Sequence, residues 1–154
     1  LEERRVFITR TFSKLFSMAG CRLGYVVGHP EDMKYIQKFC TPHNTNVFAL
    51  LFAEKILTTD GILDELIEKF KEGRTYLEKE LDENDYIHKG EAGNFLFIQP
   101  KTDAWEIVRR MKTEKRILIK GYADVGKLGD CLRVSIGERK YMQQFMEALL
   151  EIDK

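Results

Sequence analysis

The sequence has little cysteine and no pattern in which cysteine or histidine usually binds a metal. Its three cysteines form an odd set without C-x-x-C spacing, and its three histidines make no H-E-x-x-H pattern. A disulfide framework and a cysteine metal cluster are therefore both unfavoured, and we predict no metal site. We expect three ordinary buried thiols in a reducing cytosol. These side chains are Cys21, Cys40, Cys131, His29, His43 and His88.

The sequence also lacks an excess of charge of either sign, and it lacks long apolar runs. Its 25 Lys and Arg residues balance 25 Asp and Glu residues, so no broad positive field would attract nucleic acid or an anionic membrane. No apolar run approaches the length of a membrane span, and no signal peptide is recognisable. An apolar share of 44% is typical of a soluble globular protein. We therefore expect a cytoplasmic protein whose partners are neither nucleic acids nor membranes.

The beginning of the sequence indicates a piece of a longer protein. LEERRVFITR has no initiator methionine and enters a β-rich run almost at once. At 154 residues the chain can bury one good core, or form one small domain plus part of another. We expect further sequence upstream of Leu1.

Strand-like and helix-like segments alternate along the chain, which predicts an α/β or α+β fold. The breaker cluster TPHNTN at 41–46 favours a domain boundary or hinge. The segment 47–57 is apolar nearly all round and is predicted to be a buried helix. Gly73 is expected to weaken its helix by roughly 1 kcal/mol. We predict strands at 6–9, 21–28, 86–89, 94–100, 117–121 and 131–137, and helices at 30–39, 47–57, 61–83, 104–115 and 140–152.

Two of these helices carry further signals. Asp103 and Glu106 resemble a capping box, which would open the helix 104–115 with Trp105 and Val108 facing inward. The last helix repeats large apolar residues at helical spacing, which predicts that one face packs in the core. Those residues are Met142, Phe145, Met146 and Leu149.

The stretch TRTFSKLFSMAGCRLGYVVG, at 9–28, places a lysine between small hydroxyl residues and an arginine. A lysine that bonds to an aldehyde must present an unprotonated amine, which neighbouring positive charge or burial favours. The hydroxyls of Thr11 and Ser13 and the guanidinium of Arg22 could bind a phosphate. Two interpretations remain open. Lys14 could lie in a site for a phosphorylated aldehyde cofactor, or the stretch could be a plain strand–loop–strand connection with a solvated lysine and arginine.

A second arginine lies in the strand-like segment GDCLRVSIG at 129–137. Alternation with period two places Leu132, Val134 and Ile136 on one face and leaves Arg133 on the other, with Cys131 and Ser135. Arg133 could thus point off a packed sheet into a cleft and bind a carboxylate, or it could simply face solvent.

The segment GYADVGKL at 121–128 fits the pattern G-x-x-x-x-G-K of a phosphate-binding P-loop. Leu128 stands where a P-loop has the Ser or Thr whose hydroxyl binds magnesium. The segment is also predicted to lead into a strand, whereas a P-loop leads into the N-terminus of a helix. We therefore reject a P-loop here.

The string RTFSKLFSMAGCRLGY resembles the lysine signature of fold-type I, pyridoxal-phosphate-dependent aminotransferases of class I/II. In that family the lysine that carries the cofactor is followed, eight residues on, by a phosphate-binding arginine, and these correspond to Lys14 and Arg22. Thr11 and Ser13 match the hydroxyl positions that support the phosphate. GDCLRVSIG resembles the strand whose arginine, here Arg133, binds the substrate carboxylate. The resemblance implies pyridoxal 5'-phosphate as the cofactor and Lys14 as the catalytic residue.

The resemblance also implies a domain plan. It covers the whole chain but only the C-terminal part of such an enzyme. The implied parts are the end of the large domain over 1–43, a connecting helix over 44–60, and a small α/β domain with a mainly antiparallel sheet over 61–154. Relatives are homodimers that share active sites across the interface, so we expect a homodimer for the full-length protein. Because the missing N-terminal part would complete the cofactor site, we expect the isolated chain to be inactive or nearly so.

Within the family, MAGCRLGY, GNFLF and LGDCLRVSIG are similar to the histidinol-phosphate aminotransferase-like branch. The implied function is transfer of an amino group between an amino acid or histidinol phosphate and a 2-oxo acid, as in amino-acid biosynthesis. Two alternatives remain open: a pyridoxal-dependent decarboxylase of the same fold, of the threonine-phosphate type, and a non-catalytic stand-alone module.

Overall fold

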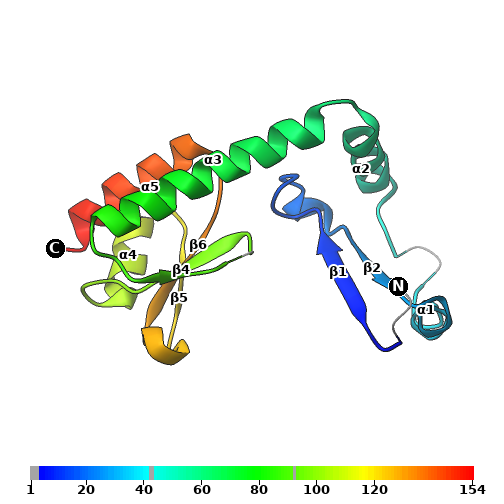
Figure 1. The fold of residues 1–154 in the computed structure, drawn as a ribbon, viewed down its shortest axis with the longest axis horizontal. Helices are drawn as coiled ribbons and strands as arrows, with labels where there is room; N and C mark the ends of the chain where they lie inside the picture. Colours follow the sequence, from blue (N-terminus) through cyan, green and yellow to red (C-terminus); the bar gives the residue numbers. More distant parts are fainter. Residues whose placement is uncertain (1–3, 42–43, 92) are drawn as a thin grey trace. The chain divides into compact units, whose positions relative to one another are not determined.

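The computed structural model describes residues 4–41, 44–91 and 93–154. The chain divides into two compact units, Leu1–Leu66 and Ile67–Lys154, which are described separately below. Figure 1 shows the order of the helices and strands along the chain. The prediction of a mixed α/β fold with antiparallel sheets is confirmed. The predicted hinge at 41–46 includes residues 42 and 43, which lie outside the described residues, and the predicted division into domains stays a prediction.

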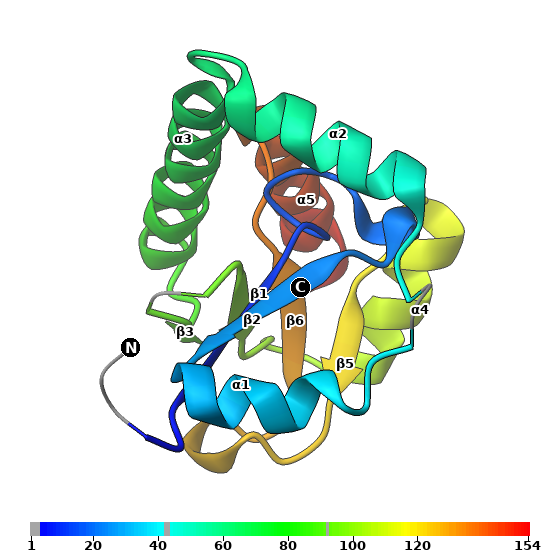
Figure 2. The ribbon, with the colours of Figure 1, turned by 90° about the vertical axis from the view of Figure 1, so that its right-hand side faces the viewer.

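The first unit is built on a β-hairpin. Strands β1 (Phe7–Thr11) and β2 (Gly24–Gly28) pair antiparallel, with Thr11 opposite Gly24. The strands close tightly at this end, because a Cβ on Gly24 would lie 2.7 Å from the backbone oxygen of Arg10. Figure 2 shows this hairpin together with helices α1 (Pro30–Gln37) and α2 (Val47–Thr58). Its small core consists of Phe12, Met18, Leu23, Ala49 and Ala53.

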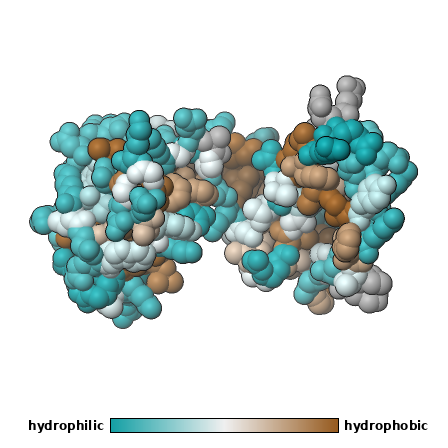
Figure 3. Space-filling view, turned by 90° about the horizontal axis from the view of Figure 1, so that it is seen from below, coloured by the Kyte–Doolittle hydropathy of each residue, from teal (hydrophilic) through white to brown (hydrophobic). Residues whose placement is uncertain are grey.

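Helix α2 forms where the sequence predicts it, but the prediction that it is buried is wrong. Asn46 begins the helix by accepting hydrogen bonds from the backbone of Phe48 and Ala49. Only Ala49 and Ala53 are buried, while Phe48 is 69% exposed. The core of the first unit is too small to cover more than one stripe of an all-apolar helix. Figure 3 shows further hydrophobic surface, in brown, on this unit at the right of the view.

The second unit is a four-stranded antiparallel sheet covered on one face by helices. The strands lie in the order β3-β4-β6-β5. Figure 1 shows that α3, α4 and α5 cover the same face. The core lies between them, and its fully buried members include Leu77, Leu96, Ile107, Leu132 and Leu149. The strands and helices are β3 (His88–Lys89), β4 (Phe95–Ile98), β5 (Lys120–Tyr122), β6 (Cys131–Ser135), α3 (Ile62–Glu83), α4 (Ala104–Glu114) and α5 (Arg139–Ile152).

Helix α4 begins as the sequence predicts, but only one of the two residues predicted to face inward does so. Val108 packs against the core, as predicted. The Asp103 carboxylate accepts a 2.6 Å hydrogen bond from the backbone of Glu106. The prediction that Trp105 faces inward is wrong, because its side chain is 49% exposed. Ala104, Ile107 and Met111 are the buried residues. Their spacing of three and four leaves position 105 at the flank of the stripe.

Several predicted strands are shorter than their sequence patterns suggest. The segment predicted as a strand at 21–28 begins instead with the end of a 3₁₀ helix, η1 (Ala19–Cys21). Arg22 follows in the left-handed conformation, with φ 52°, which an extended strand cannot contain. Residues 117–119 are likewise outside β5. The segment 121–128 ends in the 3₁₀ helix η2 (Gly126–Leu128) and leads into the strand β6, which confirms that it is not followed by the helix that a P-loop requires.

The cysteines are free thiols in unequal surroundings. Cys131 is buried, Cys21 is half-buried and Cys40 is exposed, so the prediction of three buried thiols is wrong for Cys40. Within the described ranges, no group of three or more His, Cys, Asp or Glu side chains is placed to bind a metal ion. Among the same residues, no helix is both long and apolar enough to cross a bilayer.

The end of α5 is tied to the loop after β4 by a buried carboxylate. Asp153 accepts hydrogen bonds from the backbone of Lys101 at 2.9 Å and of Thr102 at 2.8 Å. The Thr102 hydroxyl donates a third bond at 2.6 Å. A buried carboxylate that accepts several hydrogen bonds is satisfied, so this clamp fixes the loop that leads into α4.

Candidate functional site

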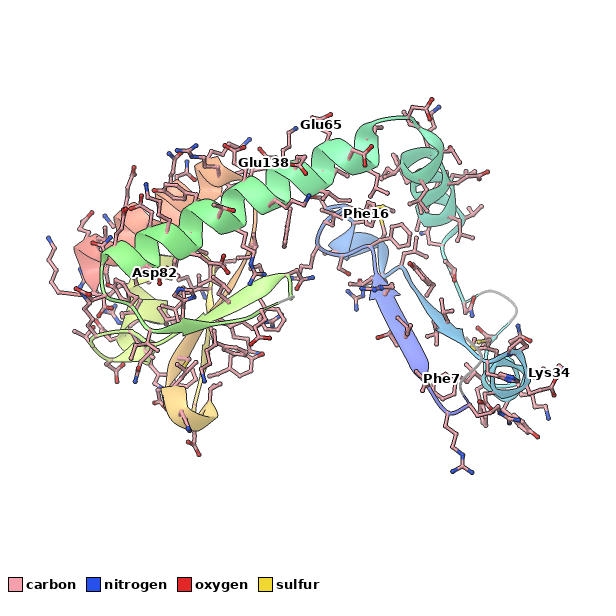
Figure 4. All side chains as sticks on the ribbon, viewed as in Figure 1. Phe7, Phe16, Lys34, Glu65, Asp82 and Glu138 are labelled. Carbon is pink, nitrogen blue, oxygen red and sulfur yellow. The ribbon has the colours of Figure 1, made fainter. Side chains whose placement is uncertain are left out.

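The end of β1 and its connection to β2 carry the four residues that the sequence resemblance assigns to a cofactor site. Figure 4 labels Phe7 at the start of β1 and Phe16 within the connection. Thr11 is the last residue of β1, and its hydroxyl lies 2.8 Å from the hydroxyl of Ser13. The backbone N–H of Ser13 also donates to the Thr11 oxygen, at 3.1 Å. The two hydroxyls are therefore held together where the loop leaves the strand.

Lys14 follows immediately and is exposed. Its backbone oxygen accepts a 2.9 Å hydrogen bond from the N–H of Ser17, which closes a turn. Ser17 adopts a positive φ of 55° within this turn. In the described part of the chain, no hydrogen bond or ion pair occupies the Lys14 side-chain amine. The amine is therefore available to a ligand.

Arg22 ends η1 on the far side of the same connection. One of its terminal nitrogens, Nη1, donates to the backbone oxygen of Ala19 at 3.2 Å. That is the single hydrogen bond of this guanidinium among the residues described, which leaves further N–H donors for an anion. Among the described residues, no hydrogen bond joins the side chains of Lys14 and Arg22. The structure brings Thr11 and Ser13 into contact, and places Lys14 and Arg22 on the same loop.

This set of side chains suits a phosphate next to a group that an amine can attack. Hydroxyls and an arginine fork are the usual side-chain donors to phosphate oxygens, and the fork can bind two oxygens at once. An exposed lysine without a carboxylate partner can form a covalent bond with an aldehyde once it loses its proton. The residues present therefore fit a phosphorylated aldehyde.

Arg133 belongs to the second unit, at the centre of β6. Its strand neighbours are Phe97 on β4 and Lys120 on β5. The predicted alternation is confirmed, since Leu132 and Val134 point into the core on either side of it. Arg133 thus lies on the sheet face opposite the helices.

Aromatic rings surround this arginine. The guanidinium carbon lies 4.1 Å from the centroid of the Phe95 ring. The Phe97 ring packs edge-on against Phe95 at 5.5 Å and against Tyr122 at 5.6 Å. The Nε atom of Arg133 is buried and has no hydrogen-bond partner. The guanidinium is therefore held by the Phe95 ring and by a polar contact with the Tyr122 hydroxyl, while its Nε stays without a partner among the described residues.

A second cation completes the same face. The Lys120 amine lies 4.9 Å from the centroid of the Tyr122 ring. The Arg133 guanidinium, and after it Lys120, lower the pKa of the Tyr122 phenol below its ordinary value. Two adjacent positive charges on an open sheet face favour an anionic ligand.

Sequence reasoning selected Arg133 but missed Phe95, Lys120 and Tyr122. The alternation of Phe95 and Phe97 with buried Leu96 and Ile98 is the signal that could have indicated an aromatic face.

Comparison with known proteins places the chain in a family. Residues 1–149 match the family described as aminotransferase class I and II. A histidinol-phosphate aminotransferase of Citrifermentans bemidjiense is 33% identical over 147 residues, which cover 96% of this chain and 42% of that protein. A histidinol-phosphate aminotransferase of Geobacter sp. strain M21 is also 33% identical, with the same shares covered. The chain therefore spans less than half the length of these relatives.

Solved structures show the same fold. The histidinol-phosphate aminotransferase of Sinorhizobium meliloti, in complex with pyridoxal-5'-phosphate, matches with a TM-score of 0.83 at 24% identity. That match covers 99% of this chain and 42% of the other. The L-threonine-O-3-phosphate decarboxylase of Porphyromonas gingivalis matches with a TM-score of 0.72 at 20% identity, over 97% of this chain and 47% of the other. Since the family match extends over nearly the whole sequence and includes every residue of both candidate sites, the chain belongs to the class I and II aminotransferases.

Proposed function

We propose that the full-length protein is a pyridoxal-phosphate-dependent aminotransferase. It would transfer an amino group between a 2-oxo acid and either an amino acid or histidinol phosphate. The observation that carries this proposal is the start of the connection between β1 and β2. There the Lys14 amine, which has no partner among the described residues, follows the bonded hydroxyls of Thr11 and Ser13. The names of the relatives, and the cofactor in the S. meliloti structure, support it.

In this proposal the loop holds the cofactor at two points. Thr11, Ser13 and Arg22 would bind the phosphate, and Lys14 would bond to the aldehyde carbon. When bound, pyridoxal phosphate supplies an electron-withdrawing ring that stabilises negative charge on the substrate α-carbon. The rest of that binding site would come from parts of the protein beyond this chain.

Lys14 would then act on the substrate itself. Once the substrate amine has displaced it, the free Lys14 Nζ accepts the proton from the substrate α-carbon as a general base. The same nitrogen later gives a proton back as a general acid. An exposed loop lysine suits this exchange of roles, because in the described part of the chain no carboxylate is bonded to its amine.

Arg133 would hold the acidic end of the substrate. A guanidinium can bind both oxygens of a carboxylate, so it suits 2-oxoglutarate and an amino-acid donor. The neighbouring Lys120 adds a second positive charge, which would favour the dianionic phosphate of histidinol phosphate. We also propose, from the family resemblance, that the full-length protein is a cytoplasmic homodimer and that the 154-residue chain alone is inactive.

The direct test of this function is chemical trapping with identification of the products. The full-length protein is incubated with pyridoxal phosphate, reduced with borohydride and digested, and the modified peptide is located by mass spectrometry. We expect the label on Lys14 and, in a separate assay, a 2-oxo acid product from the amino donor. Label scattered over surface lysines would contradict the proposed cofactor site, and a non-catalytic module would give no specific label.

A decarboxylase acting on threonine phosphate is the second candidate. The fold match to the P. gingivalis enzyme supports it, and a phosphate-bearing substrate suits the pair of Arg133 and Lys120 equally well. The same assay separates the two functions, because decarboxylation releases carbon dioxide and transamination does not.

Replacing Arg133 with alanine should raise the KM for carboxylate substrates by roughly 10- to 100-fold, the effect of losing a charge-assisted hydrogen bond. The change should affect kcat less, because Lys14, and not Arg133, moves the proton at the reacting carbon. Steady-state kinetics with 2-oxoglutarate measure both constants. Arg139→Ala is the matched control, since Arg139 is an exposed arginine of the same unit that pairs with Glu72 at 3.4 Å. An unchanged KM in the Arg133 variant would remove this residue from the substrate site.

A further inference from the structure

The guanidinium of Arg133 differs from other arginines of its unit in how it is held. Arg74 donates to Glu78 and to the backbone oxygens of Gly90 and Gly93. Arg110 donates to Glu114 and to the backbone oxygen of Ile152. Arg133 has instead a ring 4.1 Å away, a contact with the Tyr122 hydroxyl, and a buried Nε without a partner among the described residues. Buried N–H groups nearly always find an acceptor, so this exception calls for an explanation.

The Phe95 ring explains how the Arg133 guanidinium can be held in place without a carboxylate partner. The negative face of an aromatic ring attracts a guanidinium and can stack on its plane. Such a contact fixes the orientation of the plane but uses none of the N–H donors. An arginine held by a carboxylate would have its donors and its charge already engaged. Arg133 is therefore both restrained and still able to bind an anion.

Phe95 is itself held from two directions. Its ring contacts the Phe97 ring edge-on at 5.5 Å, and that ring contacts Tyr122 in the same way. The backbone next to it is fixed too, because the oxygen of Asn94 accepts a 3.0 Å bond from the N–H of Ile136. Strand pairing sets Phe95 opposite Ser135, two residues from Arg133 on β6. The ring is part of the packed sheet face and does not swing freely.

Arg74 extends this support to α3. Its guanidinium donates to the oxygen of Gly93 at 2.9 Å and to that of Gly90, at the two ends of the turn between β3 and β4. Only Asn94 separates Gly93 from Phe95 in the chain. A helix thus anchors the turn from which the Phe95 strand begins.

We propose that Phe95 is a positioning residue for the substrate-binding arginine. It holds the plane of the Arg133 guanidinium before the substrate arrives, so that less side-chain entropy is lost when a carboxylate binds. This inference rests on the proposed function, in which Arg133 binds the substrate carboxylate. Phe95 touches neither substrate nor cofactor in this role, and acts through Arg133 alone.

The test replaces Phe95 with leucine in the full-length holoenzyme. Leucine keeps an apolar residue in the strand but removes the ring face. We expect the KM for 2-oxoglutarate to rise roughly tenfold with kcat nearly unchanged, and Phe95→Tyr to restore the KM. In the Arg133→Ala background, Phe95→Leu should cause no further rise, because the group that it positions is gone. Tyr76→Leu is the matched control, since it removes a ring 5.3 Å from Arg139.

A second measurement does not depend on activity. In ¹⁵N NMR spectra of the full-length protein, the Arg133 Nε–H signal, assigned with Arg133→Lys, should be shifted upfield by the Phe95 ring. Phe95→Leu should abolish that shift and Tyr76→Leu should leave it in place. An unchanged Nε–H shift in the leucine variant would overturn the proposal. So would an unchanged KM in Phe95→Leu together with a raised KM in Arg133→Ala, which would leave the proposed function standing. If Arg133→Ala itself had no effect on KM, the substrate role of Arg133 and this inference would fail together.

Discussion

Replacement of Lys14 by alanine should abolish borohydride-trapped cofactor and lower the transamination rate by roughly 10³-fold or more. The variant loses both the atom that bonds to the cofactor and the base that removes the substrate proton. No other side chain of the loop can supply an amine, because Lys14 is the single lysine between β1 and β2 in the sequence. Labelling by mass spectrometry and kcat with saturating donor measure the two losses separately.

Two controls sharpen this test. Lys34→Ala removes an exposed lysine of the same unit, whose amine pairs with Glu31 at 2.6 Å, and should leave labelling and rate unchanged. Lys14→Arg keeps a positive charge in the loop but provides no amine that bonds to an aldehyde, so it should be as inactive as the alanine variant. Activity retained in either Lys14 variant would show that the positive charge, or another lysine, is what matters.

Gly73→Ala should destabilise the second unit by about 3 kcal/mol, well beyond the usual effect of a glycine replacement in a helix. A Cβ built on Gly73 would lie 1.9 Å from the backbone oxygen of Gly137, so α3 and the segment after β6 would have to separate. That movement would loosen the packing of Leu77 and Leu81, which are fully buried further along α3. For a unit of this size the midpoint of thermal unfolding should fall by roughly 15 °C.

The chain contains its own probe and its own control for this measurement. Trp105, its single tryptophan, lies in the second unit, so its fluorescence reports the unfolding of that unit. Gly137→Ala changes the other side of the same contact. There the new Cβ would lie 3.6 Å from the Met142 methyl group, an ordinary contact, so the midpoint should move little. Equal effects of the two alanines would contradict the steric explanation.

Gly73 also illustrates what the sequence could not predict about the fold. Helix propensity identifies glycine as a weak helix former, and on that basis alone an alanine would stabilise α3. The close approach of Gly137 reverses the sign, and it depends on how α3 crosses a segment more than 60 residues away. Local patterns predicted the type of most helices and strands. They failed for the burial of α2 and Trp105, because burial depends on how much of a helix its neighbours can cover.

The candidate sites show the same division between local and distant information. Thr11, Ser13, Lys14 and Arg22 lie within one short segment of the chain, so their spacing in the sequence already indicates their chemistry. Phe95 and Lys120 come from strands on either side of Arg133, and only the register of the sheet reveals that they share its face. A shift of one residue in that register would have placed Leu96 beside Arg133.

At Arg22, which has a left-handed backbone conformation, the residue that would be most stable differs from the residue that the proposed phosphate site requires. A side chain in this conformation costs roughly 1 kcal/mol or more, and a glycine would avoid most of that cost. A glycine would also remove the guanidinium that the proposed phosphate site requires. Selection for a more stable chain and selection for a tighter cofactor therefore favour different residues here. An arginine in this strained turn is what would be expected if anion binding were the stronger demand.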